Sequence, residues 1–239
     1  MSPLCTPPDP IALAPAGLPR LAIFGAGGLG REVLVLAHQI NEAVLTWELF
    51  GFFDDQAPAA PKSLGLPYRG TSADLIAFGQ NLTAQPLHVA VAVGRSQSRA
   101  AVVARLRPVG TGLHFPTLIH PAVARQPYQH LHFGEGCIIQ QGCILTTDSR
   151  LGDFVLLNLG CTVGHDAVLE DFCSLMPHAN VGGAAHLAIG VYLGTNATVI
   201  QGVRVGAQTI VGAGAVAIRD LPAHVTAVGV PARAINNEE

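Results

Sequence analysis

The chain has 239 residues, enough for one large domain or two small ones. Hydrophobic residues make up 49% of it, but only 5% are aromatic and 12% charged, so we expect a core of small and branched aliphatic side chains, as in tightly wound β structure. The formal net charge of −3 gives no reason to expect a nucleic-acid partner, and no apolar run approaches the ~20 residues that cross a bilayer.

The first 18 residues are interpreted as a flexible leader. Prolines interrupt their apolar stretches, and they lack the basic region that opens a signal peptide. We therefore expect a cytoplasmic protein without a membrane span.

Residues 19–113 are predicted to form a small Rossmann-like βαβ domain. Apolar strands alternate with a glycine turn and a helix, an order typical of a parallel sheet. The predicted elements are strands at 21–24, 49–53 and 87–93 and a helix at 31–38.

A GxGxxG motif formed by Gly25, Gly27 and Gly30 lies between the first strand and the helix. At that place, backbone amides and the helix N-terminus can hold phosphate. Asp54 and Asp55 end the second strand, where a carboxylate can bind a ribose hydroxyl or a base. The domain is too short for two mononucleotide-binding halves, so we expect a nucleotide or a nucleotide sugar. A purely structural glycine turn is the alternative.

Residues 114–239 contain a six-residue repeat. Fourteen consecutive positions six apart, from Phe133 to Val211, are large and apolar. The residue four positions after each of these anchors is small or β-branched. Both registers predict a parallel β-helix, in which three short strands and eighteen residues form each triangular coil and stacked coils satisfy one another's backbone hydrogen bonds.

Glycine and cysteine occupy defined positions in this repeat. Glycine often follows an anchor directly, as at Gly152 and Gly164, and we expect the backbone to turn a tight corner there. Four cysteines take the small inward position, and their spacings of 6, 18 and 12 fit no zinc pattern. We predict a packing role and no metal site for Cys137, Cys143, Cys161 and Cys173.

His165 is the candidate general base among ten histidines. It follows Val163-Gly164 and therefore lies just past a predicted corner, where side chains reach solvent or a neighbouring subunit. Asp166 beside it can orient the imidazole and raise its basicity. Asn158, seven positions earlier, is expected on an adjacent face near the same corner. The alternative is that His165 is simply a solvated surface residue.

GAGGLG, then FFDD, then a hexapeptide β-helix containing N-x6-H-D resembles the PglD/NeuD-type bacterial sugar acyltransferases over about residues 21–235. Residues 228–233, VGVPAR, look like the closing segment of such enzymes. The resemblance implies a left-handed β-helix and a homotrimer that uses acetyl-CoA, with each active site between neighbouring β-helices. It also implies that the N-terminal domain holds a UDP- or GDP-linked 4-amino-4,6-dideoxy sugar.

The same resemblance implies roles for individual residues. His165 matches the catalytic base and Asp166 its acidic partner, while Leu29 and Ser174 stand where a known member has histidines. The residues that match the nucleotide-sugar site are Gly27, Gly28, Leu29, Asp54, Asp55 and Asn158. Those expected along the coenzyme are Ser174, Gly183, Thr195 and Ala213.

The primary hypothesis is N-acetylation of an amino group on a nucleotide-activated sugar. One alternative keeps the chemistry and changes the acceptor to a hydroxyl, as in sialic acid O-acetylation. A second is a non-catalytic trimeric scaffold that binds a nucleotide sugar. A third takes GAGGLG as a nicotinamide site in an oxidoreductase, although no hydride-transfer motif accompanies it.

Overall fold

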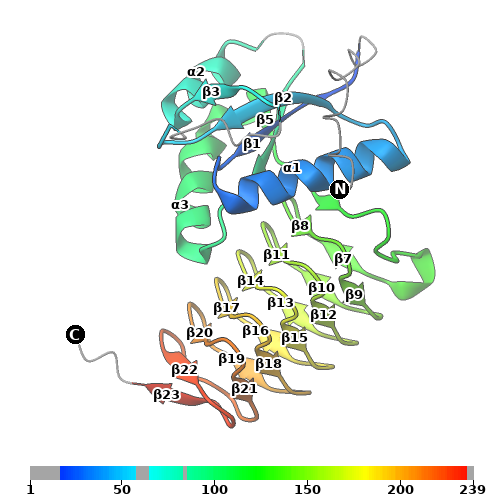
Figure 1. Ribbon diagram of the computed structural model, residues 1–239. Helices are drawn as coiled ribbons and strands as arrows, with labels where there is room; N and C mark the ends of the chain where they lie inside the picture. Colours follow the sequence, from blue (N-terminus) through cyan, green and yellow to red (C-terminus); the bar gives the residue numbers. More distant parts are fainter. Residues whose placement is uncertain (1–16, 58–64, 83–84, 236–239) are drawn as a thin grey trace, which may run out of the picture.

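The computed structural model describes residues 17–57, 65–82 and 85–235. A parallel sheet with its helices packs over the first coils of a long stack of short parallel strands (Figure 1). Of the predicted leader, only residues 17 and 18 belong to the described part. The predicted fold class, a small Rossmann-like domain followed by a left-handed parallel β-helix, is confirmed.

The N-terminal sheet is parallel throughout, with strand order β3-β2-β1-β4-β5. The order reverses between β1 and β4, and ligands of such sheets bind at the carboxyl ends of the strands beside this switch point. The strands are β1 (Arg20–Phe24), β2 (Glu48–Phe53), β3 (Tyr68–Gly70), β4 (Leu87–Val91) and β5 (Leu113–His114). The helical segments are α1 (Gly28–Ala43), α2 (Ser72–Gln80), α3 (Ser96–Leu106) and the 3-10 turns η1 (Arg107–Gly112) and η2 (Pro127–Gln129).

The stacked strands form three faces, and partners in neighbouring coils are parallel and eighteen residues apart except at the two ends of face 1. Face 1 consists of β6 (Leu118–Ile119), β8 (Ile138–Ile139), β11 (Leu156–Leu157), β14 (Ser174–Leu175), β17 (Tyr192–Leu193), β20 (Ile210–Val211), β22 (Thr226–Val228) and the antiparallel β23 (Arg233–Ile235). Face 2 consists of β9 (Ile144–Leu145), β12 (Thr162–Val163), β15 (Asn180–Val181), β18 (Thr198–Val199) and β21 (Val216–Ala217). Face 3 consists of β7 (His132–Phe133), β10 (Arg150–Leu151), β13 (Val168–Leu169), β16 (His186–Leu187) and β19 (Arg204–Val205).

The chain runs from face 1 to face 2 to face 3 and back, so each coil has a corner 1–2, a corner 2–3 and a corner 3–1. All fourteen anchors point into the coil and are buried, apart from the partly buried Phe133. The small residues four positions later are buried as well. The six-residue period therefore predicts the interior correctly.

The buried cysteines do more than fill space. Their thiols lie near backbone carbonyls of the next coil, for example Cys137 Sγ at 3.1 Å from the Gly152 oxygen and Cys143 Sγ at 3.1 Å from the Asn158 oxygen. Ser149 donates to the Gly164 oxygen in the same way, at 3.2 Å. A small donor at the inward position thus supplies a hydrogen bond to a corner carbonyl, which a buried carbonyl needs. Burial raises the pKa of the Cys137 thiol to about 11.

The explanation expected for the corner glycines is wrong. Left-handed backbone occurs two residues after them, at Phe154 (φ 54°) and Asp166 (φ 56°) and at equivalent positions of other coils. Gly164 is needed because the next coil approaches closely: a Cβ on it would lie 2.6 Å from the Gly183 nitrogen. The glycine thus permits close stacking of coils, while the turn itself falls on a residue that need not be glycine.

The N-terminal sheet and the β-helix share two apolar contacts. Helix α1 lies over face 1 (Figure 1), where its apolar side chains cluster with Leu118, Ile138 and Leu156. On the other side, the core around α3 includes Phe154, whose ring stacks on Phe172 with centroids 5.4 Å apart. The two parts therefore pack through core-like contacts. In the part of the chain that the structure describes, no helix is long and apolar enough to cross a membrane.

Candidate functional site

The glycine turn joins β1 to α1 at the carboxyl edge of the sheet. Gly27 is the N-cap of α1, and an added Cβ at Gly27 or Gly28 would meet no neighbour, so this backbone is open to a ligand. Gly30 is enclosed instead: a Cβ there would collide with the Gly25 carbonyl oxygen. The first glycine thus lets the Ala92 carbonyl after β4 approach, the third lets the helix pack against the turn, and the second leaves helix N–H groups open to phosphate.

Asp54 and Asp55, which the sequence places side by side, serve different parts of the domain. The Asp54 carboxylate accepts a hydrogen bond from the Ala26 N–H at 2.8 Å and so belongs to the glycine turn. The Asp55 carboxylate faces α2 and α3, where it accepts from the Ser72 N–H and from Arg105, both at 2.9 Å. The hydrogen bonds from Ser72, aided by Arg105, lower the pKa of Asp55. The structure therefore brings only Asp54 to the predicted nucleotide site.

Leu29 lies partly buried between the glycine turn and the β-helix. It packs against the apolar cluster that includes Leu156 on face 1. An aliphatic residue at this position thus helps to seat the N-terminal domain on the coils.

His165 and Asp166 form corner 2–3 of the coil that contains β12. The His165 Nδ1 lies 2.8 Å from Asp166 Oδ2, and both side chains are largely exposed, at 52% and 64%. The left-handed backbone at Asp166 is a conformation that Asp adopts more readily than most residues. Gly183 lies against the imidazole one coil further on, where a Cβ would be 2.6 Å from His165 Cε1. The structure thus brings His165, Asp166 and Gly183 together.

Asn158 lies at a different corner, which contradicts the expectation that it would be near His165. It follows β11 and precedes β12, in corner 1–2, whereas His165 follows β12. Thr195 and Ala213 occupy corner 1–2 of later coils, after β17 and β20. The predicted site residues therefore form two columns, one along each edge of face 2.

Ser174 lies in neither column, and its expected place beside the coenzyme is not supported. Its side chain is fully buried beneath the N-terminal domain. The hydroxyl donates to the Gly94 oxygen at 2.9 Å, accepts from Arg99 Nη2 at 2.8 Å and lies 3.0 Å from Ser96 Oγ. The serine therefore connects the two parts of the protein.

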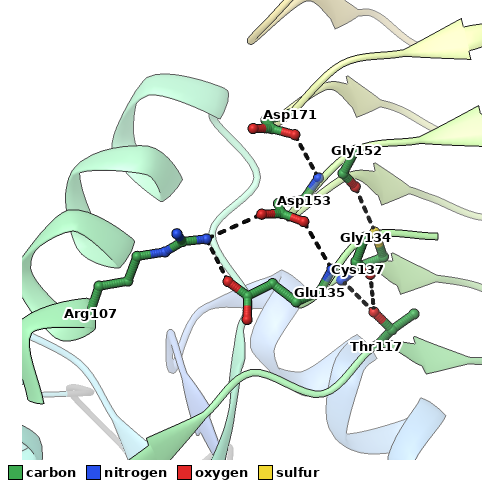
Figure 2. A network of polar contacts seen from close by, with 8 residues as sticks. All are labelled: Arg107, Thr117, Gly134, Glu135, Cys137, Gly152, Asp153 and Asp171. Atoms are coloured by element: carbon green, nitrogen blue, oxygen red, sulfur yellow. Dashed lines mark hydrogen bonds and ion pairs between the residues drawn. The ribbon is translucent and has the colours of Figure 1, made fainter. Parts of the chain in front are cut away.

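A second polar contact joins the two parts at corner 3–1. Figure 2 shows Arg107 of η1 reaching the carboxylates of Glu135 and Asp153, the latter at 3.3 Å. Asp153 Oδ1 accepts from the Glu135 N–H, and Asp171 continues the ladder by accepting from the Asp153 N–H at 2.8 Å. The Arg107 side chain is half exposed, so water screens this contact. No group of three His, Cys, Asp or Glu side chains able to hold a metal occurs among the described residues.

The protein combines a β-helix of six-residue repeats, which exposes a His–Asp pair, with a sheet whose glycine turn can hold phosphate. This combination defines an acyltransferase of the hexapeptide-repeat class. The sequence profile of the PglD N-terminal domain matches residues 20–106. The GDP-perosamine N-acetyltransferase of Escherichia coli O157:H7 is 30% identical over 218 residues, which cover 88% of this chain and 94% of that protein. The chain belongs to the PglD-type family of sugar acetyltransferases.

Two solved structures are similar over nearly the whole chain. PerB from Caulobacter crescentus, in complex with CoA and GDP-perosamine, superimposes with a TM-score of 0.79 at 32% identity and covers 91% of this chain and 97% of that one. The acetyltransferase domain of PglB from Neisseria gonorrhoeae gives a TM-score of 0.80 at 30% identity, with 90% and 99% covered. The arrangement of sheet and β-helix is thus shared with both.

Proposed function

We propose that the protein transfers the acetyl group of acetyl-CoA to the amine of a nucleotide-linked 4-amino sugar. The observation that carries this proposal is the His165–Asp166 pair, which is exposed on a rigid corner with Gly183 against its imidazole. Relatives that act on or bind GDP-perosamine favour this class of acceptor over sialic acid.

In the proposed mechanism, the Asp166 carboxylate accepts the Nδ1–H of His165 and leaves Nε2 as the base. The sugar amine attacks the thioester carbonyl, a C–N bond forms, and His165 accepts the proton that the nitrogen loses. When the C–S bond breaks, the same proton passes to the departing thiolate. Asp166 stabilises the imidazolium between these steps. General-base assistance of this kind contributes about 10²–10⁴ in rate.

In this proposal the chain divides into an N-terminal domain, residues 19–113, and the β-helix domain, residues 114–239, and the nucleotide binds to the first. There the N–H groups of Gly27 and Gly28 open α1, and Asp54 holds the turn. Leu29 in the turn packs against the apolar cluster that includes Leu156 of β11, and Asn158 directly follows that strand, so a sugar extending from the turn toward corner 1–2 would reach the column that contains Asn158.

The two columns of site residues lie on opposite edges of face 2, which supports a site shared between subunits. If corner 2–3 of one copy lies against corner 1–2 of the next, His165 of the first copy comes close to Asn158 of the second. Acetyl-CoA would then lie in the groove between copies, with Gly183 on one wall and Thr195 and Ala213 on the other. These are small residues that leave room for an extended ligand.

Face 2 carries apolar side chains that a second copy would cover. Ile144 on β9 is 60% exposed, and Leu159, Ile200 and Ile218 at the edges of this face are also exposed. Exposed apolar side chains gathered on one face mark an interaction surface. Because both edges of face 2 must contact a neighbour, we propose a ring of three copies with this face toward the axis. We also propose a cytoplasmic location, where both substrates are made.

The proposal is tested by a thiol-release assay with acetyl-CoA and a panel of UDP- and GDP-linked 4-amino sugars, with sialic acid and NAD(P)H binding measured in parallel. Release of CoA with one amino sugar, lost in His165→Ala, is the expected result. Release of CoA with sialic acid alone would show that the acceptor group is a hydroxyl and not an amine. A folded trimer that is silent with every acceptor but binds the nucleotide would be a scaffold, and nicotinamide binding would contradict the whole assignment.

A further inference from the structure

Arg99, which the mechanism above does not use, is the most deeply buried charged group among the described residues. It lies in the first turns of α3 and is only 1% exposed. Burial lowers its pKa to about 10, so it stays charged at neutral pH. Its hydrogen-bond acceptors among the described residues include no carboxylate: apart from the Ser174 hydroxyl, all are backbone carbonyls.

The guanidinium joins two parts of the chain. Its Nη1 donates to the Val93 oxygen at 2.7 Å and to the Gly94 oxygen at 3.2 Å, in the loop after β4. Its Nε donates to the Phe154 oxygen and its Nη2 to the Phe172 oxygen, both at 2.9 Å, at corner 3–1 of two successive coils. Because Phe154 and Phe172 have left-handed backbone, their carbonyls lie outside the coil ladder, and no backbone N–H of the described residues donates to them.

The loop that Arg99 holds is one wall of the proposed nucleotide site. It follows β4, the strand across the switch point from β1. The Ala92 carbonyl lies against Gly25 of the glycine turn, and Leu29 lies beside Gly94. Ser174 completes the connection from the coil side by donating to Gly94. A shift of this loop relative to the coils would therefore move the glycine turn, and any nucleotide on it, relative to the β-helix.

We propose that Arg99 is a positioning residue for the acetyl transfer. It fixes the loop at residues 92–95, beside the nucleotide site, to the coils and so sets the distance between the acceptor amine and the histidine. This inference rests on the proposed function. A guanidinium suits the task because its planar donors can engage several fixed carbonyls at once, and lysine cannot reproduce that geometry. Misplacement by about 1 Å can cost on the order of 100-fold in rate.

The test compares Arg99→Lys, Ser174→Ala and Arg107→Gln with the wild type. Arg107 is the matched control, because it spans the same two parts of the protein at an exposed contact. For each protein, we would measure kcat, the KM of both substrates and the Kd of the free nucleotide. For Arg99→Lys we expect kcat to fall by on the order of 10-fold to 100-fold while the nucleotide Kd changes less than about 3-fold. Ser174→Ala should show a smaller loss in kcat, and Arg107→Gln should stay within about 2-fold of the wild type.

A second readout does not depend on turnover. When nucleotide binds the wild type, hydrogen exchange should slow in the peptides covering residues 92–98 and 171–176. When nucleotide binds Arg99→Lys, exchange should slow only in the peptide covering residues 92–98. Unchanged kcat in a folded Arg99→Lys, or a weakened nucleotide Kd with unchanged kcat, would overturn the proposal. If the wild type transfers no acetyl group, the proposed function fails, and the exchange data alone decide whether Arg99 couples the loop to the coils.

Discussion

The N-terminal sheet and the β-helix offer their functional groups in different ways. At the glycine turn, the groups are backbone N–H donors at the start of α1, and the carboxylate of Asp54 beside them already holds the turn in place. At corner 2–3, the groups are side chains that project from a repeating ladder, and Gly183 leaves the space for the imidazole. The first region is suited to binding and the second to proton transfer, so substitutions should separate the two.

The largest expected effect is on the chemistry. His165→Ala should lower kcat by about 10²–10⁴ without changing the Kd of the nucleotide, because the exposed imidazole lies at corner 2–3, whereas the helix that follows the glycine turn packs on face 1. Steady-state kinetics and calorimetric binding would show this. His186 is the control, since it also pairs with a carboxylate, Glu170 at 2.8 Å, but on face 3. Equal losses in His186→Ala and His165→Ala would refute the assignment of the base.

The second effect tests whether the space beside the imidazole matters. Gly183→Ala puts a methyl group where the His165 ring lies, so the ring must move and kcat should fall by about 10-fold to 100-fold. The measurement is a double-mutant cycle with His165→Ala. If Gly183 acts through the imidazole, adding Gly183→Ala to the His165→Ala protein should cause almost no further loss. Additive losses would show that the glycine acts independently.

A moderate effect should appear in binding. Asp54→Ala removes the acceptor for the Ala26 N–H, so the glycine turn loosens and the KM of the nucleotide sugar should rise about 10-fold with kcat nearly unchanged. Asp55→Asn is the matched control, because this neighbouring carboxylate faces Arg105 instead. Substrate titrations of both variants would decide, and a larger rise in KM for Asp55→Asn would place the nucleotide on the other side of β2.

The smallest effect concerns the stability of the N-terminal sheet. Burial, with a further contribution from His114, lowers the pKa of His88, whose Nδ1 is buried without a hydrogen-bond partner among the described residues. The unfolded chain therefore binds more protons than the folded one below about pH 6.5, and the free energy of unfolding should decrease as the pH falls through that value. Urea denaturation at pH 7.5 and 5.5 should show a smaller pH dependence for His88→Leu than for the wild type. Identical pH dependence would remove His88 as the cause.

The sequence allows the β-helix to be predicted position by position, because each anchor and each small inward residue obeys the same six-residue rule. The N-terminal domain was predictable only in outline: β1, α1, β2 and β4 match expected elements, while β3, α2, α3 and β5 were not foreseen. These elements have short apolar runs that are not part of a repeat, so the sequence offers no second copy of the pattern to support their prediction.

Contacts between distant segments are what the sequence does not reveal. Asn158 and His165 looked close because seven residues separate them, but a strand of face 2 lies between. The family resemblance placed Ser174 beside the coenzyme, yet the N-terminal domain buries this residue. Arg99 gave no signal at all, since its carbonyl partners Phe154 and Phe172 lie 55 and 73 residues further along the chain. Backbone acceptors leave no pattern in a sequence.

The coil is also a unit of length. Every coil adds eighteen residues and advances the stack by one strand spacing, about 4.8 Å, without altering the cross-section. The N-terminal sheet packs on the coils of β8, β11 and β14, and His165 follows β12 in the coil of β11, so the histidine lies at the level of the coils that carry the sheet. Gain or loss of a coil beyond this level would change the length of the stack in one discrete step and would leave each corner, and the height of the histidine relative to the sheet, unchanged.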